Sequence, residues 1–214
     1  ELNSHQVIKR VAHFLQQRLQ NYRPRIDIIY ARKRVTAFSP NNEKIAAPLL
    51  NADLIFDGPG SPTYTVRQLQ DTVSWHYLVA RHRMGGALVF ASAAAIALGS
   101  YVLPVYEIYK AGHDLHWVPG LDFFAPYRLP AVIIPHWNNQ DGGEGLDTSR
   151  CFQGKSRFEA MLDMLPKDQI VIGIDEHTAL WMDCVDQSCQ VMGLGTITII
   201  QDGEHRVISS GGSF

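Results

Sequence analysis

The sequence predicts an α/β protein built on a mostly parallel sheet, with helices on both faces and an antiparallel hairpin at its C-terminal end. Short runs rich in branched apolar residues alternate along the chain with segments of helical spacing, which is typical of this class. Near the end, residues 196–200 and 206–208 flank Asp202-Gly203, a dipeptide typical of tight hairpin turns. Neither a repeat nor an interdomain linker interrupts this pattern, so residues 1–214 are expected to form one domain.

Composition narrows the classes of function. The 214 residues include 46% hydrophobic residues, enough for a sizeable core, and the formal net charge is −2 with a pI of about 6.5. This balance does not predict nucleic acid as a partner. Three cysteines are too few for a disulfide framework, which favours a reducing compartment. No run reaches the ~20 apolar residues of a membrane span, and the N-terminus has no signal-peptide pattern.

These observations predict a cytoplasmic protein that does not contact a membrane. The sequence allows a homodimer without specifying one.

The first third of the chain is expected to alternate helices and strands. Apolar residues recur at helical spacing over residues 3–22 and 65–83, which predicts two amphipathic helices. A short helix is expected in "NNEKIAAPLLNA", residues 41–52. The apolar runs 26–31 and 54–56 predict strands, and the second is followed by the glycine- and proline-rich turn "GPGSP".

The remainder continues the same alternation. "GALVFA", residues 86–91, predicts a buried strand, with a helix after Ser92. "PAVIIPHWNN" predicts a strand that ends in a loop, "SRFEAMLDML" a helix, and "DQIVIGIDEH" a strand with polar residues at its end. Cys184 and Cys189 are expected to flank a turn between two late strands.

Four predicted strands end in polar or glycine-rich sequence. These ends are Asp57-Gly58-Pro59-Gly60-Ser61, Ala91-Ser92, His136-Trp137-Asn138-Asn139 and Asp175-Glu176-His177. Because the carboxyl ends of parallel strands share one edge, their side chains are expected to meet there. A serine, a histidine, a carboxylate and a turn with unpaired N–H groups are the components of a nucleophilic hydrolase. Each also has an ordinary structural interpretation, as a packed small residue, a hydrogen-bonded loop residue, a polar strand end or a tight turn.

Four segments in this order, "GPGSPTYTVRQL", "FASAAAIALG", "IIPHWNN" and "IGIDEHTAL", resemble the cyanophycinase and dipeptidase E group of serine peptidases. The resemblance extends roughly from residue 51 to the C-terminus. It implies a flavodoxin-like, three-layer fold of the class I glutamine amidotransferase type with a nucleophile elbow. It further implies a small aspartyl peptide or a β-linked aspartyl amide as substrate, with no cofactor and no metal.

Site residues follow from the resemblance position by position. Ser92 corresponds to the serine of the family's Gly-x-Ser-Ala-Gly elbow, and His136 to its catalytic histidine. The third member is Glu107 by the dipeptidase branch and Glu176 by the cyanophycinase branch. Gly60 stands where the family places its oxyanion-hole glycine.

The chain departs from the family pattern at the elbow. Phe90 and Ala94 replace the two glycines, although a strained turn needs small neighbours. The amide of Ala93 is expected to hold the oxyanion together with Gly60. The chain also opens almost directly in the family's first helix, so the family's first strand is expected to be missing or replaced by another segment.

The paired histidines, the cysteines and a charged segment do not predict a particular site. His113 and His116 have a spacing that could share a metal on a helix, but the glycine and proline around them favour a loop. None of the cysteines lies at the predicted elbow, which argues against a cysteine-dependent amidotransferase. Residues 142–158 are expected to form either a solvated loop or a substrate-binding lid that uses Arg150, Lys155 or Arg157.

Three functional hypotheses therefore remain open. The favoured one is a serine peptidase with a Ser-His-Glu triad. The second is an amidase or other hydrolase that uses the same site on a non-peptide substrate. The third is a non-catalytic binding or interaction protein that keeps the fold with a degenerate elbow.

Overall fold

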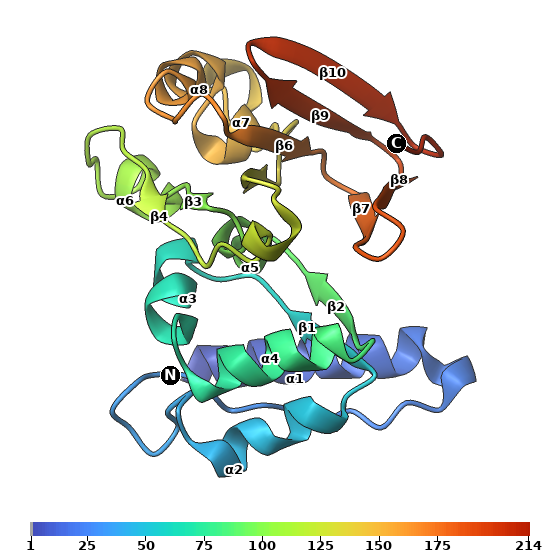
Figure 1. Ribbon diagram of the computed structural model, residues 1–214. Helices are drawn as coiled ribbons and strands as arrows, with labels where there is room; N and C mark the ends of the chain where they lie inside the picture. The colour runs from blue at the N-terminus through green and yellow to red at the C-terminus, as the bar shows by residue number, and fades with distance from the viewer. Residues whose placement is uncertain (1) are drawn as a thin grey trace. The chain divides into compact units, whose positions relative to one another are not determined.

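The computed structural model describes residues 2–214, with side chains from residue 6 onward, and shows a mixed α/β protein (Figure 1). Its Cα packing divides the chain into two compact units, residues 1–55 with 71–87 and residues 56–70 with 88–214. The mixed α/β class predicted from the sequence is confirmed.

The first unit is mainly helical. Its helices are α1 (Leu2–Arg18), the 3-10 helix η1 (Gln20–Tyr22), α2 (Glu43–Ala46), the 3-10 helix η2 (Ala47–Asn51) and α4 (Val73–Arg83). The predicted helices over 3–22 and within 41–52 are therefore present. Side-chain caps fix where two of them begin, because Asn42 accepts a hydrogen bond from the amide of Lys44 and Thr72 accepts one from that of Trp75.

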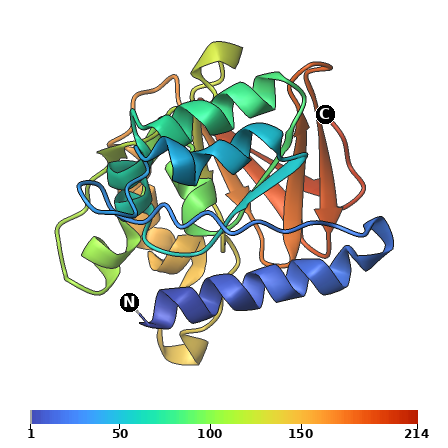
Figure 2. The same cartoon turned by 90° about the horizontal axis from the view of Figure 1, so that it is seen from below.

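Residues 26–31 are not the strand that their apolar run predicts. The structure assigns them irregular backbone, and they return in the direction opposite to α1 (Figure 2). A strand requires a partner for its backbone hydrogen bonds. The sheet formed by β1 (Leu54–Asp57) and β2 (Ala87–Phe90) has two strands and does not include residues 26–31.

The predicted helix over 65–83 is two helices, α3 (Pro62–Leu69) and α4. Asp71 between them has a φ of 55°, which a continuing right-handed helix does not allow. Thr72 is fully buried and caps α4, so the second helix starts afresh at this threonine.

The larger sheet lies in the second unit and has the strand order β10-β9-β6-β5. Its strands are β5 (Ala131–Ile134), β6 (Ile170–Ile174), β9 (Thr196–Gln201) and β10 (Glu204–Ser209). The β5–β6 pair is parallel, whereas β6–β9 and β9–β10 are antiparallel. The predicted hairpin is confirmed, with positive φ at both Asp202 (52°) and Gly203 (79°). This sheet is therefore mixed rather than mostly parallel.

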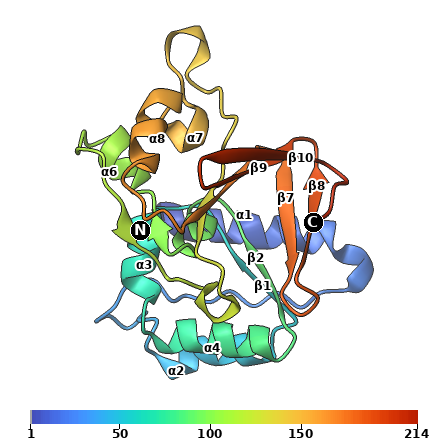
Figure 3. The same ribbon diagram turned by 45° about the horizontal axis from the view of Figure 1, so that its top comes forward.

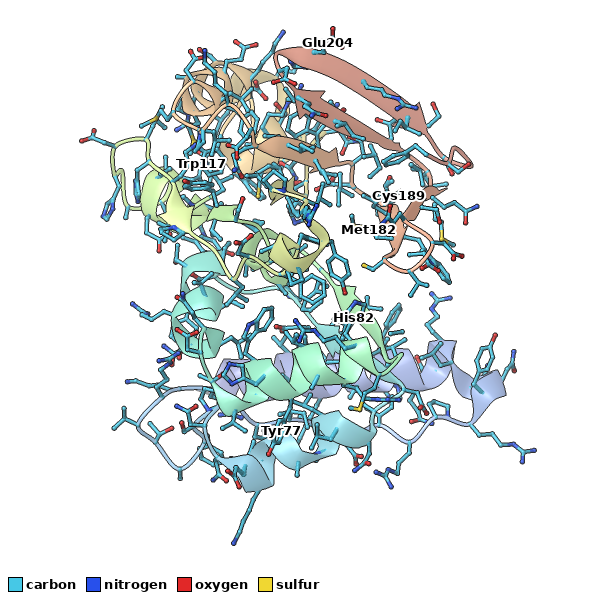
Figure 4. The ribbon with its side chains drawn as sticks, in the orientation of Figure 1. Tyr77, His82, Trp117, Met182, Cys189 and Glu204 are labelled. Atoms are coloured by element: carbon cyan, nitrogen blue, oxygen red, sulfur yellow. The ribbon has the colours of Figure 1, made fainter. Side chains whose placement is uncertain are left out.

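Two short antiparallel pairs complete the strands: β3 (Tyr101–Val102) with β4 (Val118–Pro119), and β7 (Thr178–Asp183) with β8 (Ser188–Gly193). The β7–β8 hairpin is a separate two-stranded sheet (Figure 3). Cys189 lies on β8 opposite Met182 (Figure 4). Cys184 directly follows β7, so the two cysteines flank this turn as predicted.

The core of the second unit joins its helices to β5 and β6. These helices are α3, α5 (Ala93–Ala97), α6 (Val105–Tyr109), the 3-10 helices η3 (Ala125–Tyr127) and η4 (Gly143–Gly145), α7 (Ser149–Phe152) and α8 (Lys155–Leu162). The central buried side chains are Ile96, Val102, Leu103, Val132, Ile134, Phe158, Met161 and Val171. The α8 side chains Phe158 and Met161 thereby cover the apolar strands.

Trp137 anchors the loop that follows β5. Its side chain is only 5% exposed, and its ring meets the edge of Phe158 at a centroid distance of 5.3 Å. The ring occupies the space next to Gly173 of β6, where an added Cβ would lie 2.4 Å from a ring carbon. The guanidinium of Arg150 lies 4.0 Å from the ring centroid. The glycine thus makes room for the tryptophan.

The substitution Gly173→Ala should therefore destabilise the protein by about 1–3 kcal/mol, because the added methyl group overpacks the site against the Trp137 ring. Gly145→Ala is the matched control, since a Cβ there meets open space, and its effect should stay within about 0.5 kcal/mol. Urea denaturation of both variants measures the difference. Equal urea concentrations at half-unfolding for the two variants would contradict this account of the Trp137 anchor.

Candidate active site

Ser92 lies at a sharp turn from a strand into a helix. β2 ends at Phe90 and α5 begins at Ala93. Ser92 has φ 55° and ψ −118°, a conformation that costs a residue with a Cβ about 1–3 kcal/mol. The amide of Ala91 donates to the carbonyl of Asp57 at 3.0 Å, and the carbonyl of Ser92 accepts from the amide of Ile96 at 3.1 Å. Ser92 thus lies between two backbone hydrogen bonds, one at the end of β2 and one at the start of α5.

Phe90 and Ala94, which stand where the resembled family has glycines, fit around this turn. The ring of Phe90 packs beside that of Phe123 at a centroid distance of 6.4 Å. Ala94 is 1% exposed and packs in the core as a small residue. The turn at Ser92 therefore takes its strained geometry with both replacements in place.

Ser92, His136 and Glu176 form one row of hydrogen bonds. Ser92 Oγ lies 3.0 Å from His136 Nε2, and His136 Nδ1 lies 3.1 Å from Glu176 Oε1. An ionised carboxylate only accepts hydrogen bonds, so the Nδ1 nitrogen carries the proton and Nε2 accepts from the serine hydroxyl. The side chains of His136 and Glu176 are 32% and 35% exposed, which leaves the row partly open to solvent.

The loop that carries His136 is tied down on both sides. His136 has a φ of 54°. The amide of the next residue, Trp137, donates to the carbonyl of Ile174 at the end of β6 at 3.0 Å. The carbonyls of His136 and Trp137 accept from the amides of Cys151 (3.1 Å) and Arg150 (2.9 Å). Burial raises the pKa of the Cys151 thiol to about 12, so this cysteine is a packed residue and not a nucleophile.

Two asparagines hold Glu176, a role that the sequence reasoning missed. Asn139 Nδ2 donates to Glu176 Oε1 at 2.8 Å, and the Glu176 amide donates to Asn138 Oδ1 at 2.8 Å. The Asn139 bond is the largest cause of a lowered pKa of Glu176, opposed by partial burial and reinforced by His136. The paired amides directly after "HW" are the sequence pattern that could have indicated this role.

Glu107 lies in a different hydrogen-bonded group. Its Oε1 accepts from Thr63 Oγ1 at 2.5 Å, and Thr63 Oγ1 lies 3.1 Å from Ser61 Oγ. Within residues 2–214, the glutamate that contacts His136 is therefore Glu176, and Glu107 is not brought to the histidine.

The predicted oxyanion residues lie at two local chain turns. Gly60 follows β1, and a Cβ added there would meet open space. Burial raises the pKa of Asp57 at the end of β1, although the amide of Gly58 donates to this carboxylate. Ala93 is the first residue of α5, so its N–H has no acceptor within the helix.

The other predicted groupings form no site of their own. His113 and His116 stack with ring centroids 6.3 Å apart on irregular backbone after α6. Among the residues that the structure describes, there is no group of three or more histidine, cysteine or acidic side chains suited to a metal ion. Over the same part of the chain, no helix combines the length and apolarity that crossing a membrane requires.

The segment 142–158 is partly structured and makes local contacts. It contains η4, α7 and the start of α8. Asp147 accepts from the amides of Ser149 and Lys155, and these bonds lower its pKa to about 2. Arg157 donates to the carbonyl of Gln153, and Lys155 lies 3.9 Å from Glu159.

Comparisons with known proteins support the fold. A peptidase from an acI-B1 Actinobacterium shares it with a TM-score of 0.73 at 22% sequence identity, over 98% of this chain and 77% of that one. A "Putative Peptidase E Protein" from Listeria monocytogenes EGD-e aligns at 14% identity with a TM-score of 0.44, over 78% of this chain and 64% of that one, which is too distant to add to the comparison. No family model matches the sequence, and no curated protein matches it either.

The strained turn predicts an unusual order of stability at position 92. Ser92→Gly should be more stable than Ser92→Ala by about 1–2 kcal/mol, because glycine adopts a positive φ without steric conflict. At an ordinary helix N-terminus the advantage of glycine would be smaller. Thermal and urea unfolding of the two variants measures the difference, and an alanine variant as stable as the glycine variant would contradict the strain.

Proposed function

We propose that this chain is a serine hydrolase that cleaves a peptide or a related amide bond, with Ser92 as nucleophile. The observation that carries the proposal is the row Ser92–His136–Glu176, in which each side chain lies within hydrogen-bond reach of the next. The strained backbone of Ser92 supports it, since such strain gathers at functional turns. The shared fold with a peptidase agrees with this reaction class.

The proposed reaction proceeds through an acyl-enzyme. His136 Nε2 takes the proton from Ser92 Oγ as this oxygen bonds to the substrate carbonyl carbon. The carbon–nitrogen bond then breaks, and His136 returns the proton to the departing amine. A water molecule, deprotonated by His136 in the same way, then attacks the ester carbon, the bond from this carbon to Ser92 Oγ breaks, and His136 returns the proton to Ser92 Oγ. Throughout the reaction Glu176 accepts the hydrogen bond from His136 Nδ1–H and stabilises the imidazolium form of His136.

The proposed oxyanion donors are the amides of Ala93 and Gly60. The Ala93 N–H follows the nucleophile directly and is the first amide of α5. Gly60 is carried by the turn after β1, whose Asp57 carbonyl is bonded to Ala91 beside the elbow.

The proposed substrate class is a small aspartyl peptide or a β-linked aspartyl amide, as the family resemblance implies. The proposal includes a flavodoxin-like arrangement of the strands that carry the site residues. The chemistry assigned to Ser92, His136 and Glu176 requires no cofactor.

A fluorophosphonate probe tests the activated serine without knowledge of the substrate. The wild type should be labelled at Ser92, and both Ser92→Ala and His136→Ala should abolish labelling, because the probe reacts only with a serine whose proton has an acceptor. Mass spectrometry identifies the labelled peptide, and aspartyl dipeptides are the first substrates to assay. A folded wild type that remains unlabelled would instead favour the binding-protein hypothesis.

The same labelling assay identifies the third member of the row. Glu176→Gln should lower the labelling rate by roughly 10²–10⁴-fold, since it removes the acceptor that fixes the tautomer of His136. Glu107→Gln serves as the matched control and should remain within about threefold of the wild type, because its carboxylate bonds Thr63. The opposite ranking of the two variants would assign the role to Glu107.

A further inference from the structure

Asn139 is buried beside the proposed catalytic row. Its side chain is 2% exposed, and its Nδ2 lies 2.8 Å from Glu176 Oε1. The same carboxylate oxygen lies 3.1 Å from His136 Nδ1. One oxygen of Glu176 thus receives two N–H groups, both from the loop that follows β5.

The orientation of the Asn139 amide is fixed by its other partner. Asn139 Oδ1 accepts from the backbone amide of Asp141 at 3.1 Å. A backbone N–H can only donate, so the oxygen of the side chain must face Asp141 and the NH₂ group must face Glu176. The backbone N–H of Asn139 also donates to the carbonyl of His136 at 3.2 Å. This bond fixes the distance between the two residues along the loop.

We propose that Asn139 is a positioning residue of this hydrolase, which holds Glu176 Oε1 against His136 Nδ1. This inference rests on the proposed function. In it, Asn139 does not touch the substrate and acts only through Glu176. An ionised carboxylate keeps the proton on Nδ1, which leaves Nε2 to accept the proton of Ser92.

The groups around Glu176 determine in which direction its pKa changes when the Asn139 donor is lost. The histidines that face it are His136 and His177. Asp175, its neighbour in the chain, is turned to Thr196, whose amide and hydroxyl donate to it at 2.8 Å. Loss of the Asn139 donor raises the pKa of Glu176 toward its ordinary value. Protonated Glu176 no longer accepts from Nδ1–H, so Glu176 orients His136 only at a pH above its own pKa.

The fluorophosphonate labelling rate at neutral pH tests this role. Asn139→Ala should lower the rate by roughly 10–100-fold, the size found for residues that orient a metal-ligating histidine. Asn139→Asp conserves the shape, replaces the donor by a like charge beside Glu176 and should lower the rate further. Gln140→Ala, an exposed neighbour in the same loop, should leave the rate unchanged.

Carbon-13 NMR titration of the Glu176 carboxyl group gives a readout that does not depend on activity. The pKa of Glu176 should rise in both Asn139 variants, also in a Ser92→Ala background. In the wild type, the side-chain amide protons of Asn139 should shift with the same midpoint as Glu176, a measurement that needs no variant to fold.

The two proposals fail in different ways. An unlabelled, folded wild type overturns the hydrolase and with it the role of Asn139 in that reaction. A labelled wild type overturns the role of Asn139 alone if the Asn139 variants keep the wild-type labelling rate and the wild-type pKa of Glu176. Asn139 amide protons that do not follow Glu176 in the wild type overturn it as well.

Discussion

The left-handed backbone of Ser92 is the constraint on which the geometry of the site depends. Its φ of 55° turns the chain from β2 into α5 within two residues, and so presents the hydroxyl at the end of a strand. The strain of about 1–3 kcal/mol is offset by the burial of α5 in the core. Ala94 and Ile96 are each 1% exposed, and the bond from Ala91 to Asp57 fixes the strand side of the turn. A helix that shifted to relax Ser92 would expose this apolar surface.

The loop that carries His136 is held in a similar way, with a buried anchor next to a partly exposed imidazole. Trp137 fills the space above Gly173 and stacks under the guanidinium of Arg150, while His136, one residue earlier, remains 32% exposed. The core therefore fixes the position of a side chain that remains accessible to solvent. Because β5 and β6 are parallel neighbours, the loops at their carboxyl ends lie side by side, and Glu176 reaches the histidine from the second of them.

The sequence predicted those features whose cause is local. The apolar run before Ser92 and the turn at Asp202-Gly203 each contain the residues that determine their structure. Prediction failed where the outcome depends on a distant partner. Residues 26–31 have the composition of a strand but no strand pairs with them, and the helix over 65–83 is broken at Asp71 by a left-handed residue. The periodicity of apolar residues across that break continues, so it gives no indication of two helices.

The choice between two carboxylates shows the same limit. Family resemblance left both Glu107 and Glu176 as candidates, because the dipeptidase branch points to the first and the cyanophycinase branch to the second. The contact with His136 depends on which loop the sheet brings next to β5, and only the tertiary structure contains that information. Asn139 is a similar case, since the paired amides after Trp137 indicate a polar loop but not which carboxylate they contact.

The most direct test of the account is a crystal structure of the protein after reaction with a fluorophosphonate. The account predicts a covalent bond from phosphorus to Ser92 Oγ, a positive φ at this residue, and a phosphonyl oxygen about 2.7–3.1 Å from the amide nitrogens of Ala93 and Gly60. An adduct on another side chain, or a Ser92 in regular helical backbone turned away from His136, would contradict it.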